Sequence, residues 1–115
     1  MSFPLYHYKA TVLRVVDGDT AWLRIDRGFR EFWEVSCRLY GINAPELSTG
    51  APGTAAKDWL TQRITGRTLF VKSEKLDKYG RPLVTLFDPE PATEDFALSI
   101  NQEMLAAGLA VVLRE

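Results

Sequence analysis

The sequence predicts a mainly β fold with two helices, contained in a single domain. Three consecutive runs before residue 43 have the composition or the alternating polarity of strands, and two more such runs follow a helical segment. The chain has 115 residues, of which 46% are hydrophobic, so one core can form without a disulfide or a structural metal. We therefore expect one domain over residues 1–115.

The first half of the chain contains three predicted strands. Residues 8–16 are rich in Val and Leu and stop at an Asp-Gly turn signal. Residues 20–26 alternate between apolar and polar side chains, and residues 32–42 do so again. In the third strand this alternation places Cys37 on the apolar face and Arg38 on the opposite, mainly polar face. We expect Cys37 to be a core residue rather than a reactive thiol, because a free cysteine packs as a small hydrophobe.

The second half combines two helices with two strands. Residues 54–66 have apolar side chains at helical intervals, with Thr54 as the expected N-cap and a glycine at the end. Residues 68–72 and 83–87 predict two strands joined by a turn. A capping box, Ser followed three positions later by Gln, predicts a short helix over residues 99–108. Three strands, a helix, two strands and a helix are the order expected of a five-stranded OB-fold barrel.

The charge distribution allows a basic surface on a mildly acidic protein. The net charge of −1 argues weakly against a purely electrostatic nucleic-acid binder. Residues 60–81 contain six basic and two acidic residues and are +4, whereas residues 82–115 are −5. The same pattern also fits solvated charges scattered over the surface, so composition leaves both interpretations open.

Cysteine usage and hydropathy exclude several classes of protein. Cys37 is the only cysteine, so an intrachain disulfide and a thiol-rich zinc site are excluded. Residues 1–9 lack the basic segment followed by an apolar one that is typical of a signal peptide. No apolar stretch approaches the ~20 residues of a membrane span. We expect a soluble, cytoplasmic protein that does not contact a membrane.

Groups that can hold a cation gather in residues 17–46. An Asp-Gly-Asp-Thr turn supplies two carboxylates, and oxygen ligands of this kind suit a hard cation. We predict Asp19 as the principal ligand, while Asp17 is a second ligand, a residue that orients one, or only part of the turn. The turn alone is also typical of an ordinary hairpin, and the spaced acidic pattern of an EF-hand loop is missing.

Two arginines and a glutamate complete the predicted site. Arg38, late in the third strand, and Arg81, beside a glycine turn, can bind one phosphate through the paired hydrogen bonds of their guanidinium groups. Glu46 follows a strand end and can orient or deprotonate a water that attacks phosphorus. Taken singly, each arginine also fits an exposed ion pair, and Glu46 fits an exposed loop carboxylate. The combination predicts phosphodiester chemistry.

Four segments, in this order, resemble the signature of the staphylococcal nuclease (thermonuclease) family. They are Val-Val-Asp-Gly-Asp-Thr at 15–20, Arg-Leu-Tyr-Gly-Ile-Asn-Ala-Pro-Glu at 38–46, Asp-Lys-Tyr-Gly-Arg at 77–81, and Ile-Asn at 100–101 with Gly-Leu-Ala at 108–110. The resemblance covers most of residues 8–112. It implies an OB-fold barrel and a Ca2+-dependent nuclease that hydrolyses DNA and RNA with little sequence preference and leaves 3′-phosphate ends.

The resemblance also implies roles for individual residues. Asp19 matches the metal carboxylate of the family, and Glu46 matches its proposed general base. Asp17 and Thr20 match supporting positions in the metal-binding turn. Arg38 and Arg81 match the phosphate-binding arginines of the family.

Two departures from the family pattern concern the metal. The family usually has Asp at the position of Asn43, and an amide oxygen brings no negative charge, so Ca2+ should bind more weakly. Ala44 replaces a threonine but keeps its backbone carbonyl as a donor. Short phage-encoded members of the family resemble this Asn-Ala-Pro-Glu form. Oxygen ligands alone also permit Mg2+ or Mn2+.

Two functions remain open from the sequence. The first is a monomeric nuclease that acts on DNA and RNA, preferably single strands, with Trp22, Tyr40 and Tyr79 as stacking surfaces. The second is a non-catalytic nucleic-acid or protein binding module on the same fold, which the uncharged Asn43 favours. The presence of both arginines together with Glu46 argues for the nuclease.

Overall fold

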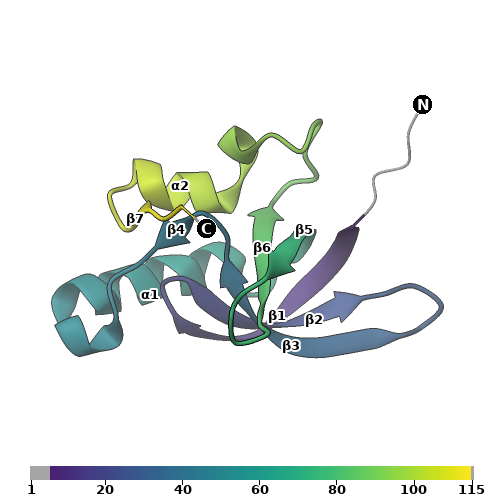
Figure 1. Cartoon of the computed structure of the whole chain (residues 1–115), viewed down its shortest axis with the longest axis horizontal. Coiled ribbons are helices and arrows are strands. Elements are labelled where there is room, and N and C mark those ends of the chain that lie inside the picture. Colours follow the sequence, from purple (N-terminus) through teal and green to yellow (C-terminus); the bar gives the residue numbers. More distant parts are fainter. Residues whose placement is uncertain (1–5, 115) are drawn as a thin grey trace.

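The centre of the protein is a closed barrel of five strands (Figure 1). They are β1 (His7–Asp17), β2 (Thr20–Asp26), β3 (Phe32–Leu39), β5 (Thr68–Leu76) and β6 (Pro82–Phe87). The computed structural model describes residues 6–114, so residues 1–5 of the segment compared with a signal peptide lie outside it. The strands pair in the order β1-β2-β3-β6-β5, antiparallel except for the parallel pair β3–β6. The predicted five-stranded OB-fold barrel is confirmed.

The predicted third strand is too long. It ends at Leu39 rather than at residue 42, because Gly41 has a φ of +79°, which turns the chain. The chain then forms the two-residue strand β4 (Ile42–Asn43), which pairs antiparallel with β7 (Val111–Val112). Neither short strand was predicted, since two residues are too few to show alternation.

The first helix, α1 (Ala51–Ile64), begins earlier than predicted. Gly50, not Thr54, is its N-cap, and Pro52 lies in the first turn, where a missing N–H costs no hydrogen bond. A 3-10 turn, Leu47–Thr49, precedes α1. The buried residues of α1 recur every three or four positions: Gly53, Ala56, Leu60 and Ile64.

The second helix, α2 (Ile100–Ala106), follows a 3-10 turn at Phe96–Leu98. The backbone N–H of Gln102 donates to the Ser99 hydroxyl at 3.0 Å, so the predicted N-cap is confirmed. The helix is shorter than expected, and Gly108 follows it with a φ of +73°. No helix within residues 6–114 is long and apolar enough to cross a membrane.

The predicted alternation in β2 and β3 places the core correctly. Leu23 is buried in β2, and Cys37 and Leu39 are buried in β3. Burial raises the pKa of the Cys37 thiol to about 12, so Cys37 is a core residue and not a reactive thiolate. Trp33 shares their face but is 42% exposed, because the hairpin of β2 and β3 extends past the rest of the barrel (Figure 1).

An ion-pair network joins α1, α2 and the end of β6. Arg63 donates from Nη1 to Asp88 Oδ2 at 2.9 Å and from Nε to Glu103 Oε1 at 2.7 Å. Arg67 Nε also donates to Asp88 Oδ2, at 2.8 Å. Burial raises the pKa of Asp88, but the hydrogen bonds from Arg67 and Arg63 outweigh it and leave the pKa below its ordinary value.

The network predicts an acid-dependent contribution to stability. Asp88→Asn should lower the free energy of unfolding by ~1–3 kcal/mol at pH 7, since two charge-assisted hydrogen bonds weaken. Because the folded-state pKa of Asp88 is lowered, this difference is present above the ordinary carboxyl pKa and disappears as the pH falls through the folded value. Urea unfolding of both proteins at a series of pH values from 7 to 2 measures it. A difference that does not decrease as the pH falls below the ordinary carboxyl pKa, or an equal effect of Asp58→Asn at an exposed site, would contradict the assignment.

Candidate active site

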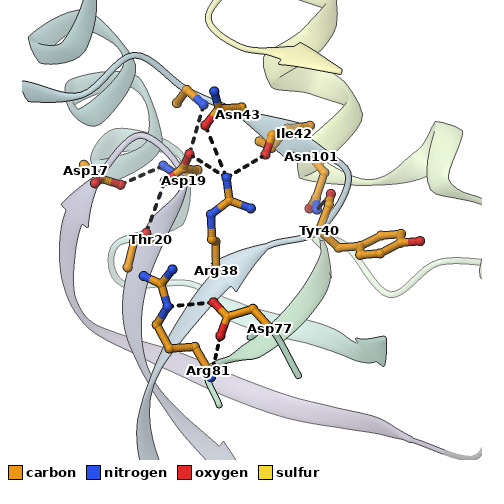
Figure 2. A network of polar contacts seen from close by, with 11 residues as sticks. Asp17, Asp19, Thr20, Arg38, Tyr40, Ile42, Asn43, Asp77, Arg81 and Asn101 are labelled. Atoms are coloured by element: carbon orange, nitrogen blue, oxygen red, sulfur yellow. Dashed lines mark hydrogen bonds and ion pairs between the residues drawn. The ribbon is translucent and has the colours of Figure 1, made fainter. Parts of the chain in front are cut away.

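The carboxylate of Asp19 lies at the centre of a polar network at one end of β2 (Figure 2). The turn before it is held by Asp17, whose Oδ1 accepts a hydrogen bond from the Asp19 N–H at 3.1 Å. Asp19 is only 7% exposed. Its Oδ1 accepts from the Thr20 hydroxyl at 3.1 Å, and its Oδ2 accepts from the Ala44 N–H at 2.9 Å. The carboxylate thus joins the turn to the segment that follows β4.

The pKa of Asp19 reflects these surroundings. Burial raises the pKa to about 6, and the neighbouring Asp17 adds to the increase. The Ala44 N–H and the positive charge of Arg38 act in the opposite direction. A buried carboxylate with this environment favours a cation nearby.

Arg38 supplies one such cation. It lies opposite Thr20 in the β2–β3 register, and its Nη2 is 3.5 Å from Asp19 Oδ2. The same nitrogen donates to Asn43 Oδ1 at 3.2 Å and to the Ile42 carbonyl oxygen at 3.3 Å. Three oxygens from two separate segments therefore surround one positively charged nitrogen (Figure 2).

Arg81 lies in the turn between β5 and β6, which Asp77 organises. Asp77 Oδ1 accepts from the backbone N–H groups of Tyr79 and Arg81 at 2.8 and 2.9 Å, and its Oδ2 accepts from Arg81 Nε at 2.8 Å. The parallel β3–β6 pairing aligns Arg38 with Leu83, two residues after Arg81. Both arginines consequently line one groove of about 430 Å3, together with Lys75, Lys78, Tyr79 and Arg114 among others.

Glu46 lies in the loop between β4 and α1 with an exposed side chain. Its carboxylate accepts a hydrogen bond from the Ser48 hydroxyl at 3.4 Å. Its backbone carbonyl is held more firmly, by the hydroxyl of Thr49 at 2.6 Å and the N–H of the same residue at 3.0 Å. The structure therefore fixes the backbone of Glu46, while its exposed carboxylate is held, within residues 6–114, only by the long hydrogen bond from Ser48.

The sequence indicated Gly18 only as part of a turn, but its small size also brings the site together. A Cβ on Gly18 would lie 2.6 Å from Ala56 Cβ in α1 and 2.7 Å from Ala44 Cβ. Three small residues thus let the Asp19 turn, the loop after β4 and α1 approach closely. A Gly beside an acidic residue signalled a turn, but this contact depends on residues 26 and 38 positions away and leaves no local pattern.

Gly18→Ala should therefore destabilise the protein and loosen the site. The added methyl group collides with two rigid side chains, and such overpacking costs ~1–3 kcal/mol. Urea unfolding measures the loss. In the double variant Gly18→Ala/Ala56→Gly one of the two collisions is removed. Gly18→Ala should therefore lower the free energy of unfolding less in the Ala56→Gly background than in the native background. An equal cost in both backgrounds would show that the contact with Ala56 is not the cause.

The side-chain oxygens at the site fit a hard cation, and they would bind it with modest affinity. Within residues 6–114, no group of three or more His, Cys, Asp or Glu side chains could hold a metal ion. However, Asp19 Oδ2 and Asn43 Oδ1 both face the Arg38 nitrogen, so a carboxylate oxygen and an amide oxygen point at one position. Oxygen donors of this kind are those that Ca2+ and Mg2+ prefer. A single facing carboxylate provides little charge for the purpose.

Asn101 is a further residue to which the sequence alone assigned no function. It is fully buried in α2, and its Nδ2 donates to the carbonyl oxygen of Tyr40 at 2.8 Å. The same Nδ2 donates to the Val84 carbonyl oxygen at 3.1 Å, and Oδ1 accepts from the Leu86 N–H at 3.0 Å. Asn101 thereby ties α2 and β6 to the turn that leads into β4.

Comparison with known proteins adds an independent finding. A family model described as "Staphylococcal nuclease homologue" matches residues 36–115. That range contains Arg38, Asn43, Glu46 and Arg81 and begins after the Asp19 turn.

Several full-length proteins are similar to this chain. An uncharacterized endonuclease of Escherichia coli O157:H7 is 32% identical over 104 residues, which are 90% of this chain and 60% of the relative. The probable endonuclease LCL3 of Saccharomyces cerevisiae (strain RM11-1a) is 31% identical, over 92% of this chain and 41% of the relative. The uncharacterized protein MJ1439 of Methanocaldococcus jannaschii is 28% identical, over 92% and 59%. The chain thus spans 60% or less of the length of these relatives.

Proposed function

The chain belongs to the staphylococcal nuclease family, and from that premise we propose that it is a nuclease that hydrolyses phosphodiester bonds. One observation carries the proposal: the buried Asp19 carboxylate and the side-chain amide oxygen of Asn43 face Arg38, beside a groove that also contains Arg81. Two relatives whose names contain the word endonuclease support it. We propose DNA and RNA as substrates, preferably as single strands, because an open groove accepts an unpaired strand more readily than a duplex.

The two arginines bind the phosphate at the cleaved bond. Their guanidinium groups remain charged and donate paired hydrogen bonds to phosphate oxygens. Arg81 is held by Asp77 in a rigid turn, so its position is set before the substrate arrives. Such preorganised donors stabilise the charge that develops on the phosphoryl oxygens in the transition state.

Asp19 and Asn43 would hold the metal, with the Ala44 carbonyl as a further donor and Asp17 and Thr20 in support. The ion, Ca2+ by family resemblance and Mg2+ or Mn2+ by donor chemistry, supplies Lewis-acid polarisation of the phosphoryl oxygens. Because Arg38 Nη2 lies within 3.5 Å of the oxygens of Asp19 and Asn43, the guanidinium must turn away from them when a cation binds. The groove that contains Arg81 is the open direction for that movement.

Glu46 is the proposed general base. Its exposed carboxylate takes a proton from a water that attacks phosphorus. The bond from phosphorus to the 5′ oxygen breaks, and that oxygen takes a proton from solvent and leaves as a 5′-hydroxyl, so the other product has a 3′-phosphate end. The firmly bonded backbone of Glu46 sets the reach of its side chain.

Release of acid-soluble fragments from single-stranded DNA, with excess Ca2+ and with chelator, tests the proposal. Cleavage that requires the cation supports it, and analysis of the ends distinguishes 3′-phosphate from 5′-phosphate products. A folded protein that cleaves neither DNA nor RNA with Ca2+, Mg2+ or Mn2+ would refute a nuclease. Binding of an oligonucleotide under those conditions would then support the non-catalytic module.

Asn43→Asp should tighten Ca2+ binding by about tenfold, since it adds a negative charge to an oxygen that already faces the cation position. The new carboxylate also attracts Arg38, but at equal distance a divalent ion gains about twice as much Coulomb energy as a guanidinium. Calorimetric titration measures the affinity. Gln62→Glu, which adds the same charge at an exposed position on α1, is the matched control. Equal affinities for native protein and Asn43→Asp would exclude residue 43 as a ligand.

A further inference from the structure

The hairpin of β2 and β3 begins at the candidate active site and extends away from it. Thr20 pairs with Arg38 at the site, and Asp26 pairs with Phe32 near the tip. At the ~3.4 Å rise of an antiparallel strand, the six steps from Phe32 to Arg38 span about 20 Å. Figure 1 shows the tip of this hairpin on the side of the barrel opposite α1.

Strand alternation places the side chain of Arg38 on the same outer face as a set of arginine and aromatic residues. Trp22 and Arg24 occupy this face of β2, and Phe32 occupies it on β3, because the residues between them point into the barrel. The face also includes two carboxylates, Asp26 and Glu34.

Arginines contact both aromatic rings on this face. The guanidinium carbon of Arg24 lies 4.1 Å from the centroid of the Phe32 ring, and that of Arg14 on β1 lies 5.7 Å from the centroid of the Trp22 ring. Phe32 is 49% exposed, and both arginines are exposed. Two arginine–aromatic pairs thus form a row that leads to Arg38, with the Trp22 pair nearer to the site.

We propose that this outer face of the hairpin binds the single strand that flanks the cleaved bond, with bases stacked on the two arginine–aromatic pairs. The inference rests on the proposed nuclease function and extends it from the cleaved phosphate to the flanking nucleotides. Unpaired bases stack on aromatic rings and on guanidinium planes alike, and each stacked base is worth ~1–3 kcal/mol.

The charges on the face limit the electrostatic share of the contact. Arg14 and Arg24 are matched in number by the carboxylates Asp26 and Glu34, and Arg38 is paired with Asp19. Stacking, rather than phosphate neutralisation, therefore provides most of the affinity, and the salt dependence of binding should be shallow for a nucleic-acid complex. A length of about 20 Å suits roughly four nucleotides, the lower end of the site sizes known for OB folds.

The opposite face of the same hairpin offers a matched control. Arg27 and Trp33 form a pair of the same chemistry there, with the guanidinium carbon 5.9 Å from the ring centroid. They line a different cavity, in the mouth of the barrel with Tyr8 and Val84 among others. Arg24→Ala/Phe32→Ala and Arg27→Ala/Trp33→Ala therefore each remove one arginine and one aromatic ring, from opposite faces of one hairpin.

The test measures binding of two fluorescein-labelled DNA strands, three and fifteen nucleotides long, by anisotropy in the presence of chelator. Arg24→Ala/Phe32→Ala should raise the Kd for the fifteen-nucleotide strand about tenfold and leave the Kd for the short strand unchanged. Arg27→Ala/Trp33→Ala should change neither. Urea unfolding of each variant confirms that the native state is populated.

Binding and cleavage separate the two proposals. If the native protein binds the long strand and the outer-face variant weakens that binding, the inference holds whether or not the strand is cleaved. If the native protein cleaves DNA but the outer-face variant binds the long strand as tightly as native protein, or both variants weaken it equally, the inference fails while the nuclease stands.

Discussion

Replacing Arg38 with alanine should lower the rate of phosphodiester cleavage ~10²-fold or more. The guanidinium lies between Asp19, Asn43 and the groove that contains Arg81, so when a cation binds to Asp19 and Asn43 it turns into the groove and donates to the charge that develops on the phosphoryl oxygens. Removal of one donor to transition-state charge costs ~10²–10³-fold in other hydrolases. Arg38→Lys keeps the charge but loses the planar fork, and we expect it to recover only part of the rate.

The experiment needs a measure of folding, because Arg38 also neutralises a buried carboxylate. The rate of release of acid-soluble fragments is compared at substrate saturation, and urea unfolding is measured on the same preparations. Arg67→Ala is the control. It removes a largely exposed arginine, and Asp88 stays bonded to Arg63. An Arg38→Ala protein that is folded and almost fully active would remove Arg38 from the proposed catalytic machinery.

Replacing Asn101 with alanine should lower the free energy of unfolding by ~3–5 kcal/mol. The substitution leaves the Leu86 N–H and the Tyr40 carbonyl without their buried partner, and each unsatisfied buried group costs ~1–3 kcal/mol. The Val84 carbonyl keeps its hydrogen bond from the Tyr40 N–H, which limits the loss. Since small domains are stable by ~5–15 kcal/mol, this single amide accounts for a large share of the total.

Urea unfolding of Asn101→Ala and Gln102→Ala measures this contribution. Gln102 is the next residue of the same helix, and its backbone N–H donates to the Ser99 cap. Since Gln102→Ala keeps that N–H, it should lower the free energy of unfolding by less than ~0.5 kcal/mol. Asn101→Asp keeps the acceptor for Leu86 but places a carboxylate against two carbonyl oxygens, so its loss should be as large at pH 7. A loss below ~1 kcal/mol for Asn101→Ala would show that water replaces the amide.

Local patterns predicted the barrel well because strand alternation is a local property. Side chains alternate between the two faces of a strand, so Cys37 and Arg38 were predicted on opposite faces. The Ser99 cap was predicted from two residue types three positions apart. The predicted start of α1 at Thr54 was wrong, because Pro52 suits the first turn of a helix and the N-cap is Gly50. The helix begins three residues before Thr54.

The arrangement of the site was predicted less completely, since it depends on contacts between distant segments. The turn residues and Arg38 could be found from residue type and spacing, and the structure brings Asp17, Asp19, Thr20, Arg38, Asn43 and Ala44 together. Their hydrogen bonds could not be found in this way, because the Asp19–Ala44 bond spans 25 positions and the Asn101–Tyr40 bond spans 61. The metal-binding and catalytic roles of these residues, and those of Arg81 and Glu46, stay predictions.

The pairing of β4 with β7 has a practical consequence for handling the protein. Val111 pairs with Asn43, the Leu113 N–H donates to the Gly41 carbonyl at 2.9 Å, and Arg114 lines the groove beside Arg38. A purification tag, dye or fusion partner attached after residue 114 would emerge next to the groove that contains Arg38 and Arg81. Attachment chemistry is better directed to an exposed position on α1, such as Asp58→Cys, since the native Cys37 is buried and would not compete for the reagent.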